Sequence, residues 1–253
     1  MKHPYVLLDE MLHEAHQVQK LVQEQAEALA AVPAHRTVYS TPSLLLGLHT
    51  PTLLLGIHYS GAFKKGRKLK SPGQRKDYLS YDSDAEGNLL RITHHDDSLP
   101  YTHYFYRRGG REWAVPLFRS ETSGLYCFYP YYTFFAEYDP SGRIRYFGMV
   151  RGHELRVESY RYDLDSEQFA LCDYWKYIPT LTGSSQTAAL WETGSPAQLW
   201  RFVLDLSDPK HISGKKAASI TRDDSARPPV TPAVFWTEEA DALPQPDLYV
   251  DMD

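Results

Sequence analysis

Apolar side chains recur every three or four residues between Tyr5 and Val32, a stretch that contains neither Gly nor Pro. This spacing places them along one stripe of an amphipathic helix. Pro4 suits the first helical turn, and Pro33 ends the segment because the residue before a proline is forced out of the helical region. We therefore predict a long N-terminal helix within residues 1–33. Its stripe consists of Leu8, Met11, Ala15, Val18, Val22 and Leu29.

The same stripe also fits a short heptad repeat, with Leu8, Ala15, Val22 and Leu29 on one seam. Two interpretations follow from this fit. The preferred one is a helix that packs on its own domain. The alternative is dimerisation, or the binding of a partner helix, through residues 5–32.

An apolar motif occurs twice in succession, at residues 43–49 and again at residues 52–58. We interpret the two copies as similar buried strands. Residues 37–63 carry no Asp, Glu, Lys or Arg, but prolines and glycines interrupt any helix there. The stretch is therefore not expected to span a membrane.

Short aromatic strands separated by Asp- and Gly-containing turns fill most of the remaining chain, which is typical of antiparallel hairpins. The expected strands are residues 78–82, 89–93, 101–106, 113–115, 134–139, 143–147, 159–163, 169–171 and 200–205. We predict an α+β fold in which the helix packs on an extended antiparallel β-meander. The sheet body covers residues 34–222 and forms a single domain with the helix.

The C-terminal residues 223–253 differ in composition, with eight acidic side chains, one basic side chain and five prolines. This composition predicts an extended acidic tail. Residues 64–76 form a run of basic side chains, opposite in charge to the tail. We interpret that run mainly as a solvated loop. A second helix is expected near residues 187–191.

The turn Tyr138-Asp139-Pro140-Ser141-Gly142-Arg143-Ile144 resembles the YD repeat of Rhs-type proteins, and Tyr81-Asp82 to Gly87-Asn88-Leu89 is similar with two residues inserted. The resemblance covers about a fifth of the chain. It implies a bacterial setting and an accessory or immunity role beside an Rhs-type toxin. Hairpin chemistry alone also explains these residues, because Tyr favours strands, Asp caps turns and Gly takes a positive φ.

Net charge and cysteine content limit the binding partners and the cellular compartment that we expect for the protein. A net charge of −5 and a pI near 6.1 argue against general binding to nucleic acid. Cys127 and Cys172 lack the spacing of a redox pair, so we expect reduced thiols. Because the N-terminus also lacks a secretory pattern, we expect a cytoplasmic protein. No phosphate-binding or dinucleotide-binding motif is present, and we predict neither a cofactor nor a metal site.

One polar cluster carries the residue types of acid–base catalysis. It comprises His94, His95, Asp96 and Asp97, with His103 nearby. We interpret this run as a loop that follows a strand, and adjacent strand residues would in any case point to opposite faces. These five residues are weak candidates for the catalytic groups of a hydrolase or a carbohydrate-directed enzyme with an aromatic-lined cleft.

Aromatic residues are unusually dense in the middle of the chain. Of 34 Phe, Trp and Tyr residues, 16 lie between Tyr101 and Phe147. Tyrosine-rich surfaces suit protein interfaces and also small ligands. We expect a non-enzymatic module with a protein partner, and the enzyme is the alternative. The predicted binding residues are Tyr101, Tyr104, Tyr106, Tyr126, Tyr129, Tyr131 and Tyr132.

Overall fold

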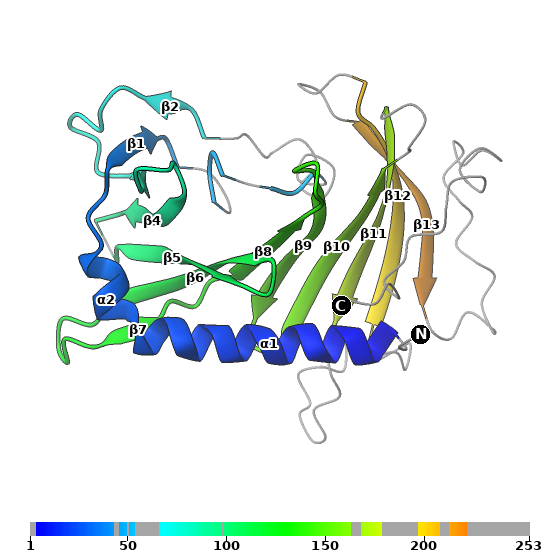
Figure 1. The fold of residues 1–253 in the computed structure, drawn as a ribbon, viewed down its shortest axis with the longest axis horizontal. Helices are drawn as coiled ribbons and strands as arrows, with labels where there is room; N and C mark the ends of the chain where they lie inside the picture. Colours follow the sequence, from blue (N-terminus) through cyan, green and yellow to red (C-terminus); the bar gives the residue numbers. More distant parts are fainter. Residues whose placement is uncertain are drawn as a thin grey trace. The chain divides into compact units, whose positions relative to one another are not determined.

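The computed structural model describes residues 4–42, 46–49, 51–53, 66–97, 99–162, 168–178, 197–207 and 213–221. These residues form two helices and a set of antiparallel strands, labelled in Figure 1. The helices are α1 (Pro4–Glu24) and α2 (Ala26–Ala31). The predicted acidic tail at 223–253 and the predicted helix near 187–191 lie outside the described residues.

The chain divides into two compact units, Glu14–Tyr138 and a second unit that combines residues 1–13 with 139–253. In the first unit the strands lie in the order β8-β6-β5-β4-β3-β1-β2, and β7 also pairs with β6. Their bounds are β1 (Arg36–Ser40), β2 (Lys68–Leu69), β3 (Tyr78–Ser83), β4 (Leu89–His95), β5 (Tyr101–Arg108), β6 (Arg111–Arg119), β7 (Tyr126–Phe128) and β8 (Thr133–Tyr138). Every described pairing within this unit is antiparallel.

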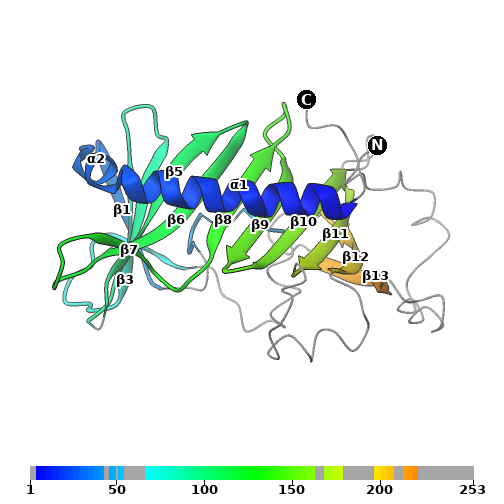
Figure 2. The ribbon, with the colours of Figure 1, turned by 90° about the horizontal axis from the view of Figure 1, so that it is seen from below.

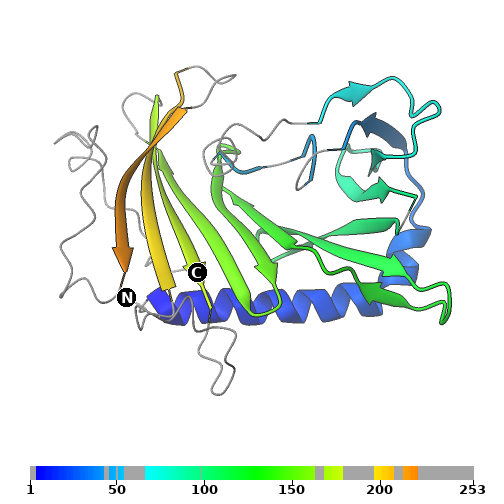
Figure 3. The same cartoon turned by 180° about the vertical axis from the view of Figure 1, so that it is seen from behind.

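The other unit is a continuous meander in which each strand pairs with the next, as Figure 3 shows. Its strands are β9 (Ile144–Arg151), β10 (Glu154–Tyr162), β11 (Phe169–Tyr177), β12 (Ala197–Asp205) and β13 (Ser213–Thr221). The hydroxyl of Tyr177 donates a hydrogen bond to Asp9 of α1. The expected antiparallel meander of hairpins is therefore present.

The predicted N-terminal helix is divided into two helices, so an unbroken helix over residues 5–32 is not seen. The break falls at Gln25, whose φ and ψ of −96° and 3° depart from helical values. As predicted, helical structure begins at Pro4, and Val32 is extended before Pro33. Among the described helices, none is long and apolar enough to cross a membrane.

The apolar stripe of α1 is buried, as its period indicated. Within the first unit, Ala15, Val18 and Val22 have no exposed surface. Polar side chains at the edge of the stripe bond to the sheet: Gln19 Nε2 donates to Thr133 Oγ1 over 2.8 Å, and Gln23 Nε2 donates to the Tyr126 carbonyl over 2.8 Å. These buried side chains and hydrogen bonds show that this part of the stripe packs within the chain. Figure 2 shows the course of α1 and α2. Dimerisation through residues 5–32 stays a prediction.

The first copy of the apolar repeat is not a strand where the structure describes it. Leu46, Gly47 and Leu48 form a turn in which Gly47 has a φ of +65°. A Cβ at Gly47 would lie 2.1 Å from the hydroxyl of Tyr81, so only glycine fits this approach. The strand prediction for 43–49 is therefore wrong at these residues, and most of the second copy, 52–58, lies outside the described part.

Aspartate side chains close two of the hairpin turns by accepting hydrogen bonds from backbone N–H groups. Asp139 Oδ1 accepts hydrogen bonds from the backbone N–H groups of Ser141 and Arg143, each over 2.9 Å. In the turn before β4 the corresponding acceptor is Asp84, which bonds to the N–H of Asn88 over 2.7 Å. Asp82 lies within β3, as the expected strand 78–82 had it, and Asp84 takes the turn-closing role that the YD-like pattern gives to Asp82.

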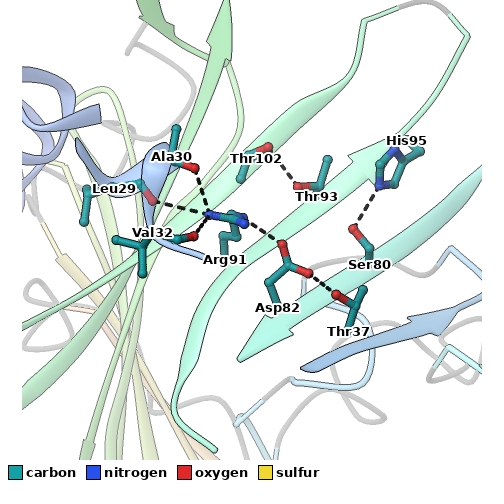
Figure 4. A network of polar contacts seen from close by, with 10 residues as sticks. All are labelled: Leu29, Ala30, Val32, Thr37, Ser80, Asp82, Arg91, Thr93, His95 and Thr102. Atoms are coloured by element: carbon teal, nitrogen blue, oxygen red, sulfur yellow. Dashed lines mark hydrogen bonds and ion pairs between the residues drawn. The ribbon is translucent and has the colours of Figure 1, made fainter. Parts of the chain in front are cut away.

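Asp82 belongs to a polar network that joins β3 and β4 to the end of α2 (Figure 4). Arg91 Nε donates to Asp82 Oδ2 over 2.7 Å, and the same guanidinium donates to backbone carbonyls at the end of α2, including that of Ala30. A cation at this end satisfies carbonyls that lack helical partners. Asp82 Oδ1 also accepts from Thr37 Oγ1 over 2.7 Å. This contact ties β1 to the network.

Candidate functional site: an aromatic and histidine cluster

A compact cluster of rings lies on one face of the sheet in the unit Glu14–Tyr138. We call it the tyrosine–histidine cluster and define it as His94, Tyr101, His103, Tyr129, Tyr131 and Phe134. Tyr101 is its centre, because its ring stacks on Tyr129 with centroids 3.9 Å apart and planes 5° apart. Strand pairing explains the assembly: His94 lies opposite Tyr101, and His103 follows Tyr101 by two residues on the same face of β5.

His103 is buried among these rings, with 2% of its surface exposed. Its ring centroid lies 5.5 Å from that of Tyr101, 6.1 Å from that of Tyr131 and 5.6 Å from that of Phe134. Burial, together with a smaller effect of nearby His94, lowers the pKa of His103 to about 3. His103 is consequently a neutral imidazole at neutral pH.

A specific pH dependence of stability follows from this burial. An unfolded histidine has a pKa of about 6.5, so at pH 5 the unfolded chain binds a proton that native His103 does not bind. The contribution of neutral His103 to the free energy of unfolding is fully present above pH 6.5, and it is lost as the pH falls towards 3. We expect unfolding by urea to show a loss of about 2 kcal/mol from this group between pH 7.5 and pH 5.

The control for this pH dependence is the variant His103→Gln, whose side chain cannot titrate. The variant should lose about 2 kcal/mol less than the natural chain over the same pH interval. Equal losses in the two proteins would show that His103 is accessible to protons in the native state.

His94 has an acidic partner. Its Nε2 lies 2.9 Å from Asp77 Oδ1, and its ring meets the edge of Tyr101 at a centroid distance of 5.1 Å. The sequence interpretation of His94 and His95 as loop residues is wrong, because both lie in β4. β4 is two residues longer than the predicted strand since His94 and His95 pair with Leu79 and Tyr78 of β3.

The other acid–base candidates do not join His94 and His103. His95 lies on the opposite face of β4, where its Nε2 is 2.9 Å from Ser80 Oγ and its ring stacks on Tyr78. Burial lowers the pKa of His95. Asp97 forms an ion pair of 2.7 Å with Lys76, and Asp96 is half-buried beyond the end of β4. His94 and His103 both contact the ring of Tyr101.

The seven predicted binding tyrosines divide between the two faces of the sheet. Tyr101 lies on the cluster face, whereas Tyr104 and Tyr106 lie on the other face of β5 because strand side chains alternate. Tyr104 is buried and meets Tyr126 edge to face at 6.0 Å. Tyr129, Tyr131 and Tyr132 are half-buried in or beside the connection to β8. Tyr101 and Tyr104 are thus buried contacts of Tyr129 and Tyr126 on the two faces of the sheet.

The sequence analysis did not identify Asp77 and Ser80, which are the side-chain partners of His94 and His95. Both lie at or near β3, and the register of β3 against β4 places them beside His94 and His95. Alternation along β3 and β4 is visible in the sequence, but their register is not. In the described part of the chain, no group of three or more His, Cys, Asp or Glu side chains is arranged to hold a metal ion.

The most exposed apolar side chains described in this unit lie in the chain segment that leads to Tyr129 and Tyr131. We define residues 125–132, Leu-Tyr-Cys-Phe-Tyr-Pro-Tyr-Tyr, as the tyrosine segment. Leu125 is 66% exposed and Phe128 is 42% exposed. The segment contains β7, which pairs with β6 through the register Leu117 to Phe128. Phe128 is therefore held at the end of a paired strand, and Leu125 directly precedes that strand.

In comparisons with known proteins, the chain matches no protein-family model, no curated protein and no solved structure. A functional proposal therefore rests on the residues described above.

Proposed function

We propose that this chain is a protein-binding module whose contact surface is the tyrosine segment. The observation that carries the proposal is the exposure of Leu125 and Phe128 in the same segment as the half-buried rings of Tyr129, Tyr131 and Tyr132. Aromatic side chains concentrate the binding energy of protein interfaces, since they bury a large area with few rotatable bonds.

The segment is also held in place before any partner arrives. The N–H of Tyr129 donates to the Pro116 carbonyl over 3.0 Å, and the N–H of Tyr131 donates to the Tyr129 carbonyl over 2.7 Å. The stack of Tyr129 on Tyr101 fixes one ring further. A surface ordered in this way loses little conformational entropy on binding, which favours affinity.

The resemblance of the turn at Tyr138–Ile144 to YD repeats suggests which partner to test first. An Rhs-type bacterial protein is that partner, and an accessory or immunity role in the cytoplasm is the corresponding biological setting. The binding proposal itself depends only on the tyrosine segment and stands for any other protein partner.

The test is affinity capture from a lysate of the source organism, followed by calorimetry with the purified partner. We expect one stoichiometric complex. The double substitution Tyr131→Ala with Tyr132→Ala should weaken it at least 30-fold, because each interface hot spot contributes about 2 kcal/mol or more. Phe128→Ala should weaken it as well.

The matched control is Phe169→Ala, since Phe169 is 40% exposed and lies outside the tyrosine segment, on β11. This variant should bind as the natural chain does. Unchanged affinity in the Tyr131 and Tyr132 double variant, with its circular dichroism spectrum retained, would refute the proposed surface.

A further inference from the structure

Two rings of the tyrosine segment, those of Tyr129 and Tyr131, share one neighbour, Tyr101. Tyr129 stacks on Tyr101 with centroids 3.9 Å apart, and Tyr131 lies 6.0 Å from it with planes 48° apart. Tyr131 also meets the ring of Tyr132 edge to face at 5.6 Å. Tyr129, Tyr131 and Tyr132 are half-buried, so part of each side chain meets solvent. The face of a tyrosine ring carries partial negative charge and attracts cations.

Two carboxylates act on the same central ring. Asp77 Oδ1 lies 2.9 Å from His94 Nε2, and the ring of His94 meets that of Tyr101 at a centroid distance of 5.1 Å. Burial, with smaller electrostatic contributions from groups that include Asp96 and Asp77, raises the pKa of Tyr101. The side chain of Asp77 is 60% exposed, and Asp96 is half-buried. The rings and the carboxylates therefore form one surface of negative potential.

The groups around this surface do not cancel its negative potential. Lys76, which precedes Asp77, forms an ion pair of 2.7 Å with Asp97. The basic side chains of β2 are separated from β3 by β1, about 10 Å away, where salt screens them. His103 is neutral, because burial lowers its pKa to about 3. Its buried Nε2 has no hydrogen-bond partner among the described residues and, since the ring donates to the backbone of Tyr132 through Nδ1–H, keeps a lone pair.

The chain itself shows how an arginine meets a tyrosine ring and a carboxylate at once. The guanidinium carbon of Arg143 lies 4.6 Å from the ring centroid of Tyr162, while its Nε donates to Asp139 Oδ2 over 2.9 Å. A planar guanidinium stacks on a ring and keeps its N–H donors for a carboxylate, whereas the ammonium group of lysine is a compact point charge. Arginine is therefore the cationic side chain that best fits rings and carboxylates together.

We propose that the partner of the tyrosine segment presents an arginine side chain, which binds against the rings of Tyr129 and Tyr131. The carboxylates of Asp77 and Asp96 supply the negative field that attracts its charge. This inference rests on the proposed function, since it names the chemistry of the partner at the same surface. Arginine is one of the residues that carry most of the binding energy of protein interfaces.

The first test does not require the natural partner. The full chain with carbon-13 in its tyrosine rings is titrated with the tripeptide glycyl-arginyl-glycine, blocked at both ends, and followed by nuclear magnetic resonance. We expect the ring resonances of Tyr129 and Tyr131 to shift and to saturate in the millimolar range. The same peptide with citrulline, an uncharged analogue of arginine, should bind at least about 5-fold more weakly. A lysine peptide should also bind more weakly than the arginine peptide.

Single variants then test the two parts of the surface. Asp77→Asn removes the charge but keeps an oxygen for His94, and it should weaken binding of the arginine peptide about 2- to 5-fold. Tyr131→Leu keeps an apolar side chain without a π-face and should weaken binding by a similar factor. Glu86→Gln is the matched control, because Glu86 is exposed in the turn at the opposite end of the β3-β4 hairpin from Asp77. It should bind the arginine peptide as the natural chain does.

Three results would each overturn the inference: unshifted resonances of Tyr129 and Tyr131, equal affinity for the arginine and citrulline peptides, or equal affinity of Asp77→Asn and Glu86→Gln for the arginine peptide. The comparison of peptides uses the natural chain, so it decides even where a variant does not fold. The proposed function fails separately. A captured partner that needs Tyr131 and Tyr132 but tolerates Asp77→Asn would retain the binding surface and overturn only the arginine.

Discussion

Arg111→Ala is expected to destabilise the unit Glu14–Tyr138 by about 3–5 kcal/mol, because it leaves two carboxylates without their cation. Arg111 is 3% exposed and begins β6. Its guanidinium bonds to Glu14 of α1, and its Nε donates to Glu137 Oε2 of β8 over 3.2 Å. It also lies 5.5 Å from the ring centroid of Phe135. The measurement is urea unfolding followed by circular dichroism.

The control for this loss is Arg107→Ala. Arg107 also pairs with a carboxylate, Glu112, at 3.0 Å, but its side chain is more than half exposed. Solvent screens such a pair, so its removal should cost less than about 1 kcal/mol. Combining Arg111→Ala with Glu14→Gln and Glu137→Gln should recover part of the loss. Equal costs for Arg111→Ala and Arg107→Ala would contradict the structural role of the buried cation.

Trp113→Ala should lower the free energy of unfolding by about 3–5 kcal/mol, since it removes the largest fully buried side chain among the described residues. Trp113 lies in the middle of the β5-β6-β8 sheet, and its ring centroid is 4.9 Å from that of Phe135. Because the surroundings of a deleted core side chain relax only in part, a cavity is expected where the indole was. Thermal and urea denaturation of the variant measure the loss.

Phe128→Ala is a suitable comparison for Trp113→Ala, because Phe128 belongs to the same unit and remains substantially exposed. Its truncation should change the free energy of unfolding by less than about 1 kcal/mol while it weakens partner binding. A Trp113→Ala protein as stable as Phe128→Ala would show that the aromatic core is not closely packed around the indole.

The hairpins and the helical stripe are the parts of the fold that sequence patterns predicted well. In both cases the interacting residues are close along the chain. Asp139 and the N–H groups that it binds are separated by at most four residues, so local turn chemistry suffices. The burial of Ala15, Val18 and Val22 likewise follows from their helical period.

Candidate site residues were predicted as residue types but not as an arrangement. The seven predicted binding tyrosines come from one aromatic region of the sequence, and alternation along β5 places Tyr101 on one face and Tyr104 and Tyr106 on the other. Gly47 shows the same limit: the apolar run around it reads as a strand, but its close approach to Tyr81 requires a turn.

The sequence by itself determined the local elements: where helical structure begins and ends, which side chains of α1 are buried, and where aspartate and glycine close the turns. The tertiary structure alone decided which distant groups meet. Arg111 joins Glu14 from 97 residues away, and the register of β3, β4 and β5 places Asp77 beside His94 and His103 beside Tyr101. Strand register depends on packing summed over a whole sheet face, which no short stretch of sequence contains.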